Sequence, residues 1–150
     1  MEAVKSILRS SEIFSGLSES HLDLVASAIK IRKFAAGDYL FQQGDDRKAC
    51  FVIAEGQVEV TRDNGDGPEP LILLGPGDTA GEQAFLTSVA HTASARVHSD
   101  SVLLELDRQL VLERLGQDGG AAIAILSKVS NVLHRRLVYT GSSRMGREQD

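Results

Sequence analysis

The spacing of hydrophobic and polar positions changes twice along the chain and divides it into three zones. Within residues 1–30, apolar side chains recur three or four positions apart, as in Val4, Ile7 and Leu8. A second helix is expected in LSESHLDLVASAI, with Ser18 as its N-cap residue. This zone is therefore predicted to consist of N-terminal helices.

Residues 31–106 have the pattern of many short strands. β-Branched and aromatic side chains, with partial alternation of apolar and polar positions, occur in DYLFQ, CFVIA, QVEVT, LILL, SARV and VLLEL. Glycine-containing turns such as DNGDGPEP and GPGD separate these segments. Short strands with closely spaced turns indicate a β-sandwich or a small barrel.

Helical spacing returns in residues 107–140. Asp107 is the expected cap of a helix in RQLVLERLGQ, and a second helix follows in AAIAILSKVSNVLHRRLVY. Residues 141–150 are mostly polar and are expected to form a frayed tail. The apolar stripe expected on the last helix consists of Ile123, Leu126, Val129 or Ser130, Leu133 and Leu137. The whole chain, 1–150, is predicted to form one domain.

The composition is that of an ordinary globular domain and narrows the range of functions. Of 150 residues, 42% are apolar and 25% are charged, and the formal net charge of -5 argues against phosphate-backbone binding as the main task. The single cysteine, Cys50, excludes an internal disulfide and a four-cysteine metal site. No apolar run approaches the roughly 18 residues of a membrane span, and no signal peptide is recognisable. We expect a cytoplasmic protein that does not bind membranes.

The order of these elements, together with the glycine spacing, resembles the cyclic-nucleotide-binding domain family. FAAGDYLFQQGDDRKACFVIAEGQVEV (34–60) is similar to the first half of that domain, and GPGDTAGEQAFL (75–86) is similar to its second half, which contains the phosphate-binding cassette. IFSGLSESHLDLVASAI resembles the family's N-terminal helical segment, so the resemblance covers about residues 13 to 137. It implies a mainly β fold, a double-stranded β-helix (jelly-roll) flanked by N-terminal helices and two C-terminal helices. It also implies a non-enzymatic sensor whose ligand is cAMP or cGMP and which needs no cofactor.

The resemblance places the cassette at residues 80–94 and assigns roles within it. Gly81 would form a tight turn, Glu82 would accept a hydrogen bond from the ribose 2′-hydroxyl, and the amides of Gln83 and Ala84 would point at the cyclic phosphate. Free amides at a helix start favour anions, which supports this assignment on physical grounds. The base would lie under the C-terminal helix, around residues 125–137. The predicted ligand-binding residues are Gly81, Glu82, Gln83, Ala84, His91, Thr92 and Ala93.

His91 departs from the family's pattern. The family's cassette ends in Pro-Arg-Thr/Ala-Ala, and its arginine binds the phosphate, whereas this chain has Ala90-His91-Thr92-Ala93. Losing one partner of a buried charge pair costs about 2–5 kcal/mol, or roughly a hundredfold in affinity. Strand alternation would place Arg96 on the opposite face, so it is not expected to substitute. A bound anion would raise the pKa of His91, so binding is expected to strengthen as pH falls, and His91→Arg is expected to raise affinity by roughly tenfold.

Two interpretations of the cassette are open at this point. One is a weakened, pH-sensitive site for a cyclic nucleotide. The other is a structural relic in which His91 begins a surface strand and Glu82 is an ordinary helix N-terminal carboxylate. In the second case the domain would serve as a protein-interaction or dimerisation module.

The expected partners follow from the C-terminal helices. As a stand-alone sensor, the domain would shift these helices against an unknown partner protein, and it could form a homodimer through residues 121–137, using Leu126, Val129, Leu133 and Leu137. Direct DNA binding is not expected, because the basic HRRL segment is typical of a helix C-terminus and no helix-turn-helix follows.

No catalytic or metal-binding constellation is recognisable in the sequence. The four histidines are scattered, which argues against a cupin-like metal site. The run from Asp45 to Lys48, which includes Arg47, is interpreted as a solvated turn, and Cys50 as a small buried strand residue. The chain is not expected to be an enzyme.

Overall fold

The structure, a computed structural model, describes residues 1–85, 87, 89–116 and 119–149, with side chains as far as residue 136. Helices lie at both ends of the chain and strands in its middle. The elements are α1 (Glu2–Ser10), α2 (Glu19–Ala26), β1 (Ile29–Phe34), β2 (Tyr39–Phe41), β3 (Ala49–Glu55), β4 (Val58–Asp63), β5 (Pro68–Leu74), β6 (Thr79–Ala80), the 3₁₀ helix η1 (Glu82–Phe85), β7 (Ser94–Val97), β8 (Ser101–Asp107), α3 (Arg108–Leu115) and α4 (Gly119–Gln149).

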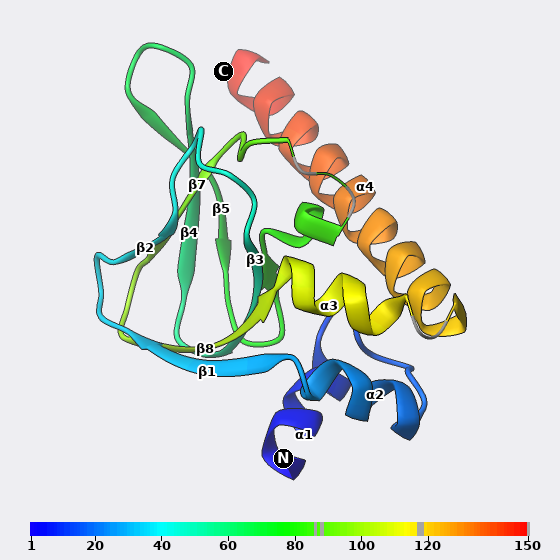
Figure 1. Ribbon diagram of the computed structural model, residues 1–150. Coiled ribbons are helices and arrows are strands. Elements are labelled where there is room, and N and C mark those ends of the chain that lie inside the picture. Colours follow the sequence, from blue (N-terminus) through cyan, green and yellow to red (C-terminus); the bar gives the residue numbers. More distant parts are fainter. Residues whose placement is uncertain (86, 88, 117–118, 150) are drawn as a thin grey trace.

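The strands form two antiparallel four-stranded sheets. One has the order β1-β8-β3-β6 and the other the order β2-β7-β4-β5. Helices α1 and α2 lie at one end of this roll, α4 runs along its side, and the β4–β5 hairpin projects at the opposite end (Figure 1). This is the jelly-roll with flanking helices that the sequence predicts.

Strand β3 connects two hydrophobic cores because both of its faces are buried. Cys50 and Val52 cannot share a face with Phe51 and Ile53, since successive side chains in a strand point to opposite sides. Cys50 and Val52 pack with the helices, whereas Phe51 and Ile53 pack between the two sheets. The helices are thus fixed to the outer face of one sheet by the same strand that holds the two sheets together.

The sequence predicts most of these elements, including both N-terminal helices and the cap residues of α2 and α3. The side chain of Ser18 accepts a hydrogen bond from the His21 amide, and that of Asp107 accepts one from the Leu110 amide. Strand β1 is not predicted by the sequence pattern and begins before residue 31. IKIRKF alternates apolar and polar residues only as far as Arg32, and this strand at the edge of a sheet is largely exposed, with Ile31 60% exposed.

The apolar stripe expected on the last helix is partly wrong. The residues of α4 that are buried against the core are Ala121, Ile125, Val129 and Val132, whereas Ile123 is 70% exposed. Because Val129 is fully buried within its own chain, it is not available to a dimer interface. Leu126 and Leu133 are partly buried against the same core, and the side chain of Leu137 lies outside the described residues.

Helix α4 also extends further than expected. We expect its end near residue 140 and a frayed tail over residues 141–150, but the helix continues to Gln149. No proline interrupts this segment, and a single glycine in a helix costs only about 1 kcal/mol relative to alanine. Among the described residues, no helix is both long enough and apolar enough to cross a membrane.

Gly56, between β3 and β4, gives a test of the fold. Its φ is +98°, and a Cβ atom built there would lie 2.7 Å from Cβ of Ser101. Gly56→Ala is therefore expected to lower the free energy of unfolding by at least about 2 kcal/mol, from backbone strain and overpacking together. Urea denaturation measures this change.

Gly65→Ala is the matched control for Gly56→Ala. Gly65 also has a positive φ, +113°, but nothing lies within 4 Å of the position that a Cβ atom would take there. Its substitution should cost the backbone strain alone, and equal losses in the two variants would show that the contact with Ser101 is unimportant.

Candidate functional site

A pocket of about 320 Å³ lies where η1 and the adjoining strands face α4. Such a volume suits a small organic ligand. Six of the seven residues predicted to bind a ligand line this pocket, and the exception is Ala84, which is fully buried. The described residues that line it are Phe41, Arg47, Val60, Arg62, Leu71, Ile72, Ala80, Gly81, Glu82, Gln83, His91, Thr92, Ala93, Leu133 and Arg136.

Gly81 makes the turn into η1, and glycine is required there for two reasons. Its φ is +78°, and a Cβ atom would lie 3.1 Å from the carbonyl oxygen of Ala49. The Ala84 amide donates to the Gly81 carbonyl at 3.0 Å, so it cannot point at a ligand as expected. The physical reason is that a 3₁₀ turn closes its first hydrogen bond one residue earlier than an α-helix does.

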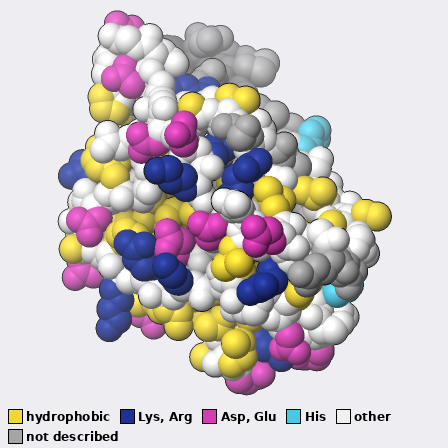
Figure 2. All heavy atoms as spheres, in the orientation of Figure 1, with side chains coloured by type: hydrophobic (Ala, Val, Ile, Leu, Met, Phe, Trp, Pro, Cys, Tyr) yellow, Lys and Arg dark blue, Asp and Glu magenta, His cyan; other side chains and the backbone are white. Residues whose placement is uncertain are grey.

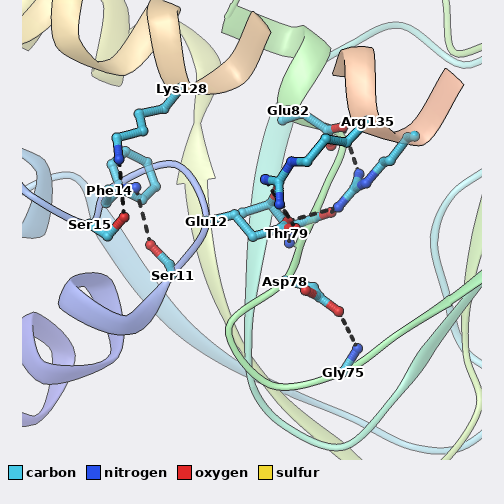
Figure 3. Close-up of polar contacts among 11 residues, drawn as sticks. Ser11, Glu12, Phe14, Ser15, Gly75, Asp78, Thr79, Glu82, Lys128 and Arg135 are labelled. Carbon is cyan, nitrogen blue, oxygen red and sulfur yellow. Dashed lines mark hydrogen bonds and ion pairs between the residues drawn. The ribbon is translucent and has the colours of Figure 1, made fainter. Parts of the chain in front are cut away.

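Glu82 is 3% exposed and is bound by Arg136 of α4. Nη1 of Arg136 lies 2.6 Å from Oε1 of Glu82, while Nη2 lies 2.9 Å from Oε2 of Glu12 and 2.8 Å from the carbonyl oxygen of Thr79. Glu12, Thr79 and Glu82 come from separate segments and lie close together (Figure 3). Burial raises the pKa of the Glu82 carboxyl, and the Arg136 guanidinium opposes this rise.

These contacts correct two interpretations of the sequence. Glu82 is not an ordinary solvated carboxylate at a helix start, because its charge is paired with Arg136, 54 positions away. The HRRL segment is not a helix C-terminus, because α4 continues past it to Gln149. Arg136 therefore points into the protein and forms part of the pocket wall.

His91 is buried, with 4% of its surface exposed. Its ring stacks on Phe41 with the ring centroids 3.7 Å apart and the planes inclined by 7°. Its amide donates to the Asp45 carbonyl and its carbonyl accepts from the Gly44 amide, each at 2.8 Å. His91 is thus no surface residue at the start of a strand: β7 begins at Ser94.

The surroundings of His91 favour its neutral form. Burial and the adjacent Arg47 lower its pKa from 6.5 to about 4, although Asp45 acts in the opposite direction. The imidazole is therefore neutral near pH 7 and supplies no positive charge to a ligand. The expected rise of this pKa on binding an anion stays a prediction, and it would have to start from about 4.

Arg47 is one of several pocket residues that the sequence interpretation misses, and it is the most deeply buried arginine among them. Its neighbours from Gln42 to Lys48 are exposed, but Arg47 itself is 8% exposed and lines the pocket. A run of charged residues normally marks a solvated turn, so the local pattern offers no reason to single it out. The available signal is indirect: a cassette without its arginine needs a cation from elsewhere.

The lining combines an apolar part with a cationic part. Val60, Leu71, Ile72 and Leu133 form the apolar part, and the charged lining residues comprise three arginines and one glutamate. This local excess of positive charge stands in a chain of net charge -5. On the face shown in Figure 2, acidic and basic side chains are interspersed, without a large uniformly basic area. No cluster of potential metal ligands occurs among the described residues.

Comparisons with known proteins agree with this geometry. The cyclic AMP receptor protein of Thermus thermophilus is 36% identical over 103 residues, which are 68% of this chain and 48% of that protein. The cGMP-dependent protein kinase 2 of Homo sapiens is 25% identical over 118 residues, 77% of this chain and 16% of the kinase. The chain thus spans about half of the first relative and a smaller part of the second.

A solved structure supports the same relationship. The regulatory domain of Toxoplasma gondii PKA, crystallised with cAMP, matches with a TM-score of 0.68 and 29% identity, over 73% of this chain and 42% of that one. A family model described as a cyclic nucleotide-binding domain matches residues 31–118. The chain therefore belongs to the cyclic nucleotide-binding domain family.

Proposed function

We propose that this domain is a regulatory, non-catalytic module that binds cAMP or cGMP in the pocket and transmits binding through α4. The observation that carries the proposal is the position of Glu82. This carboxylate, the expected acceptor for a ribose hydroxyl, lies buried on the pocket wall and is paired with an arginine of α4. The same residue would therefore recognise the ligand and report its arrival to the helix.

The lining suggests how a cyclic nucleotide would be arranged. The ribose 2′-hydroxyl would donate to Glu82, which places the phosphate next to Gln83 and the cationic part of the lining. The base would then contact the apolar part, including Leu133 of α4. This arrangement uses each part of the pocket for the chemical group that it suits, since burial of an apolar base and pairing of an anion both lower the free energy of binding.

The output of the domain depends on what happens to Arg136. A ribose hydroxyl that donates to Glu82 competes with the Arg136 guanidinium for the same carboxylate. The contacts of Arg136 with Glu12 and Thr79 would then have to adjust, and they join α4 to the N-terminal segment and to β6. An unknown partner protein would detect the resulting shift of α4.

A homodimer through residues 121–137 remains a proposal, in which Val129 can take no part.

Glu82→Gln is expected to weaken the binding of cAMP and cGMP at least tenfold. A hydrogen bond to a charged group contributes about 1.5–3 kcal/mol, and the neutral amide loses most of this. Isothermal titration measures the affinity, and Glu113→Gln, on the exposed side of α3, is the control. Unchanged affinity in a folded Glu82→Gln variant would exclude the ribose role. If the wild-type protein binds neither nucleotide, the domain is instead a ligand-free interaction module.

Nucleotide affinity is expected to be the same at about pH 6 and about pH 8. His91, with its pKa lowered to about 4, is neutral at both values. In the unfolded chain this ring gains its proton near pH 6.5 and in the folded chain only near pH 4, so His91 lowers the stability of the fold as the pH falls below about 6.5. Titrations at the two pH values test this, and clearly tighter binding at the lower pH would show that the bound anion protonates His91.

Hydrogen exchange tests the coupling to α4. A saturating cyclic nucleotide is expected to accelerate amide exchange in α4 around Arg136, because the helix loses part of its attachment to Glu82. In Arg136→Gln this exchange should already be fast and respond less to the ligand. Arg135→Gln is the matched control, since Arg135 is mostly exposed and lies 3.9 Å from Glu12. Exchange in α4 that ignores a bound nucleotide would rule out this route of transmission.

A further inference from the structure

Arg47 is a buried cation for which the described part of the chain offers no carboxylate partner. Arg47 is 8% exposed, and its Nε atom is buried without a hydrogen-bond acceptor. Its two hydrogen bonds are to uncharged groups, Nδ1 of His91 and Oε1 of Gln83. A guanidinium has more N–H donors than these two contacts use. Burial lowers the pKa of Arg47, and the Glu82 carboxylate, which is bound to Arg136, offsets this only in part, so the position favours an incoming anion.

The position of Arg47 is fixed by the structure around it. Two backbone hydrogen bonds of 2.8 Å join the loop between β2 and β3 to His91: the Gly44 amide donates to the His91 carbonyl, and the His91 amide donates to the Asp45 carbonyl. At the head of the side chain, Nη1 lies 3.3 Å from Nδ1 of His91, and Nη2 donates to Oε1 of Gln83 at 3.1 Å. The side chain is therefore held between the cassette helix η1 and the segment that precedes β7.

The contact with His91 defines what that residue does. An arginine only donates, so Nδ1 of His91 must accept, and the ring is the neutral tautomer with its proton on Nε2. The stacking on Phe41 keeps the ring in this orientation. An arginine at position 91 would bring a second guanidinium against Arg47, and like charges repel. The chain thus has a cation at the cassette, carried by a different segment, and His91→Arg is expected to weaken anion binding.

The other arginines nearby have different roles. Arg136 is paired with two carboxylates. Arg62 donates through Nε to the Thr92 carbonyl, and as a half-buried residue it keeps contact with solvent. Arg96 donates to the Gly37 carbonyl, lies over the Tyr39 ring and is absent from the pocket lining.

We propose that Arg47 is the counter-charge for the phosphate of the bound ligand, with His91 and Gln83 as the residues that position it. The inference rests on the proposed function and adds to it the phosphate-binding group. The ligand chemistry that it selects is a phosphodiester, whose negative charge would pair with the buried guanidinium of Arg47.

The test compares cAMP and cGMP affinities of the wild type, Arg47→Gln and Arg62→Gln by isothermal titration. Arg47→Gln is expected to bind at least about thirtyfold more weakly, from the loss of a buried charge partner, and Arg62→Gln much less so. Because His91 acts by accepting a hydrogen bond, His91→Gln should retain more affinity than His91→Leu. If the wild type binds nucleotide and Arg47→Gln binds equally well, the inference is overturned while the proposed function stands.

Ligand-free stability provides the second measurement. Arg47→Met, which removes the unpaired charge and keeps an apolar side chain, should melt at the same temperature as the wild type or above it. A large fall in the melting temperature would assign Arg47 a structural role and overturn the inference.

If the wild type binds neither nucleotide, the proposed function fails, and a titration with inorganic phosphate at constant ionic strength decides the role of Arg47. A phosphate-dependent rise in melting temperature that Arg47→Gln lacks would support the anion role, and no rise in the wild type would overturn it.

Discussion

The ion-pair cluster around Arg136 is the constraint on which the rest of this structure depends. One guanidinium binds carboxylates from the N-terminal segment and from η1, together with a carbonyl of β6. Breaking a buried pair by removing one partner costs about 3–5 kcal/mol, because the other charge is left uncompensated. The cluster therefore fixes α4 against the roll and closes one wall of the pocket at the same time. Glu82 thus belongs both to the pocket wall and to the contact that positions α4.

Local periodicity predicts those parts of the fold that depend on local contacts. The helices α2 and α3 follow from apolar spacing and cap residues, and the strand-like nature of β3 follows from its apolar run. Strand β1 is missed because its residues are mostly exposed at a sheet edge. The stripe on α4 is misplaced at Ile123 because the sequence offers apolar residues on more than one face, and only tertiary packing selects Ile125 and Val132. Such choices depend on the partner surface and not on the helix itself.

Most of the candidate site is predictable, and its charges are not. The resemblance correctly groups Gly81, Glu82, Gln83, His91, Thr92 and Ala93, which all line one pocket. The two arginines that set the electrostatics of the pocket stand in runs of charge, DDRK and HRRL, that look solvated. Arg47 meets its partners 44 and 36 positions away, and Arg136 meets Glu82 54 positions away. No local pattern contains that information, because burial of a long cationic side chain is decided by segments brought together only in the folded chain.

The histidine in the cassette is explained by this division of charge. A family member with arginine at this position would place its cation on the cassette itself, whereas in the proposed site the cation is Arg47, from the loop between β2 and β3, in contact with His91. The two arginines consequently belong to different parts of the molecule, Arg47 to the roll and Arg136 to α4. A ligand with only a phosphate can satisfy the first, and a ligand with only a hydroxyl can compete with the second. A ribose cyclic phosphate presents a phosphate and a hydroxyl at a fixed separation. Unlike the other two ligands, it would therefore neutralise Arg47 and displace Arg136 in one binding event. Selectivity and signalling would then arise from the same geometric requirement.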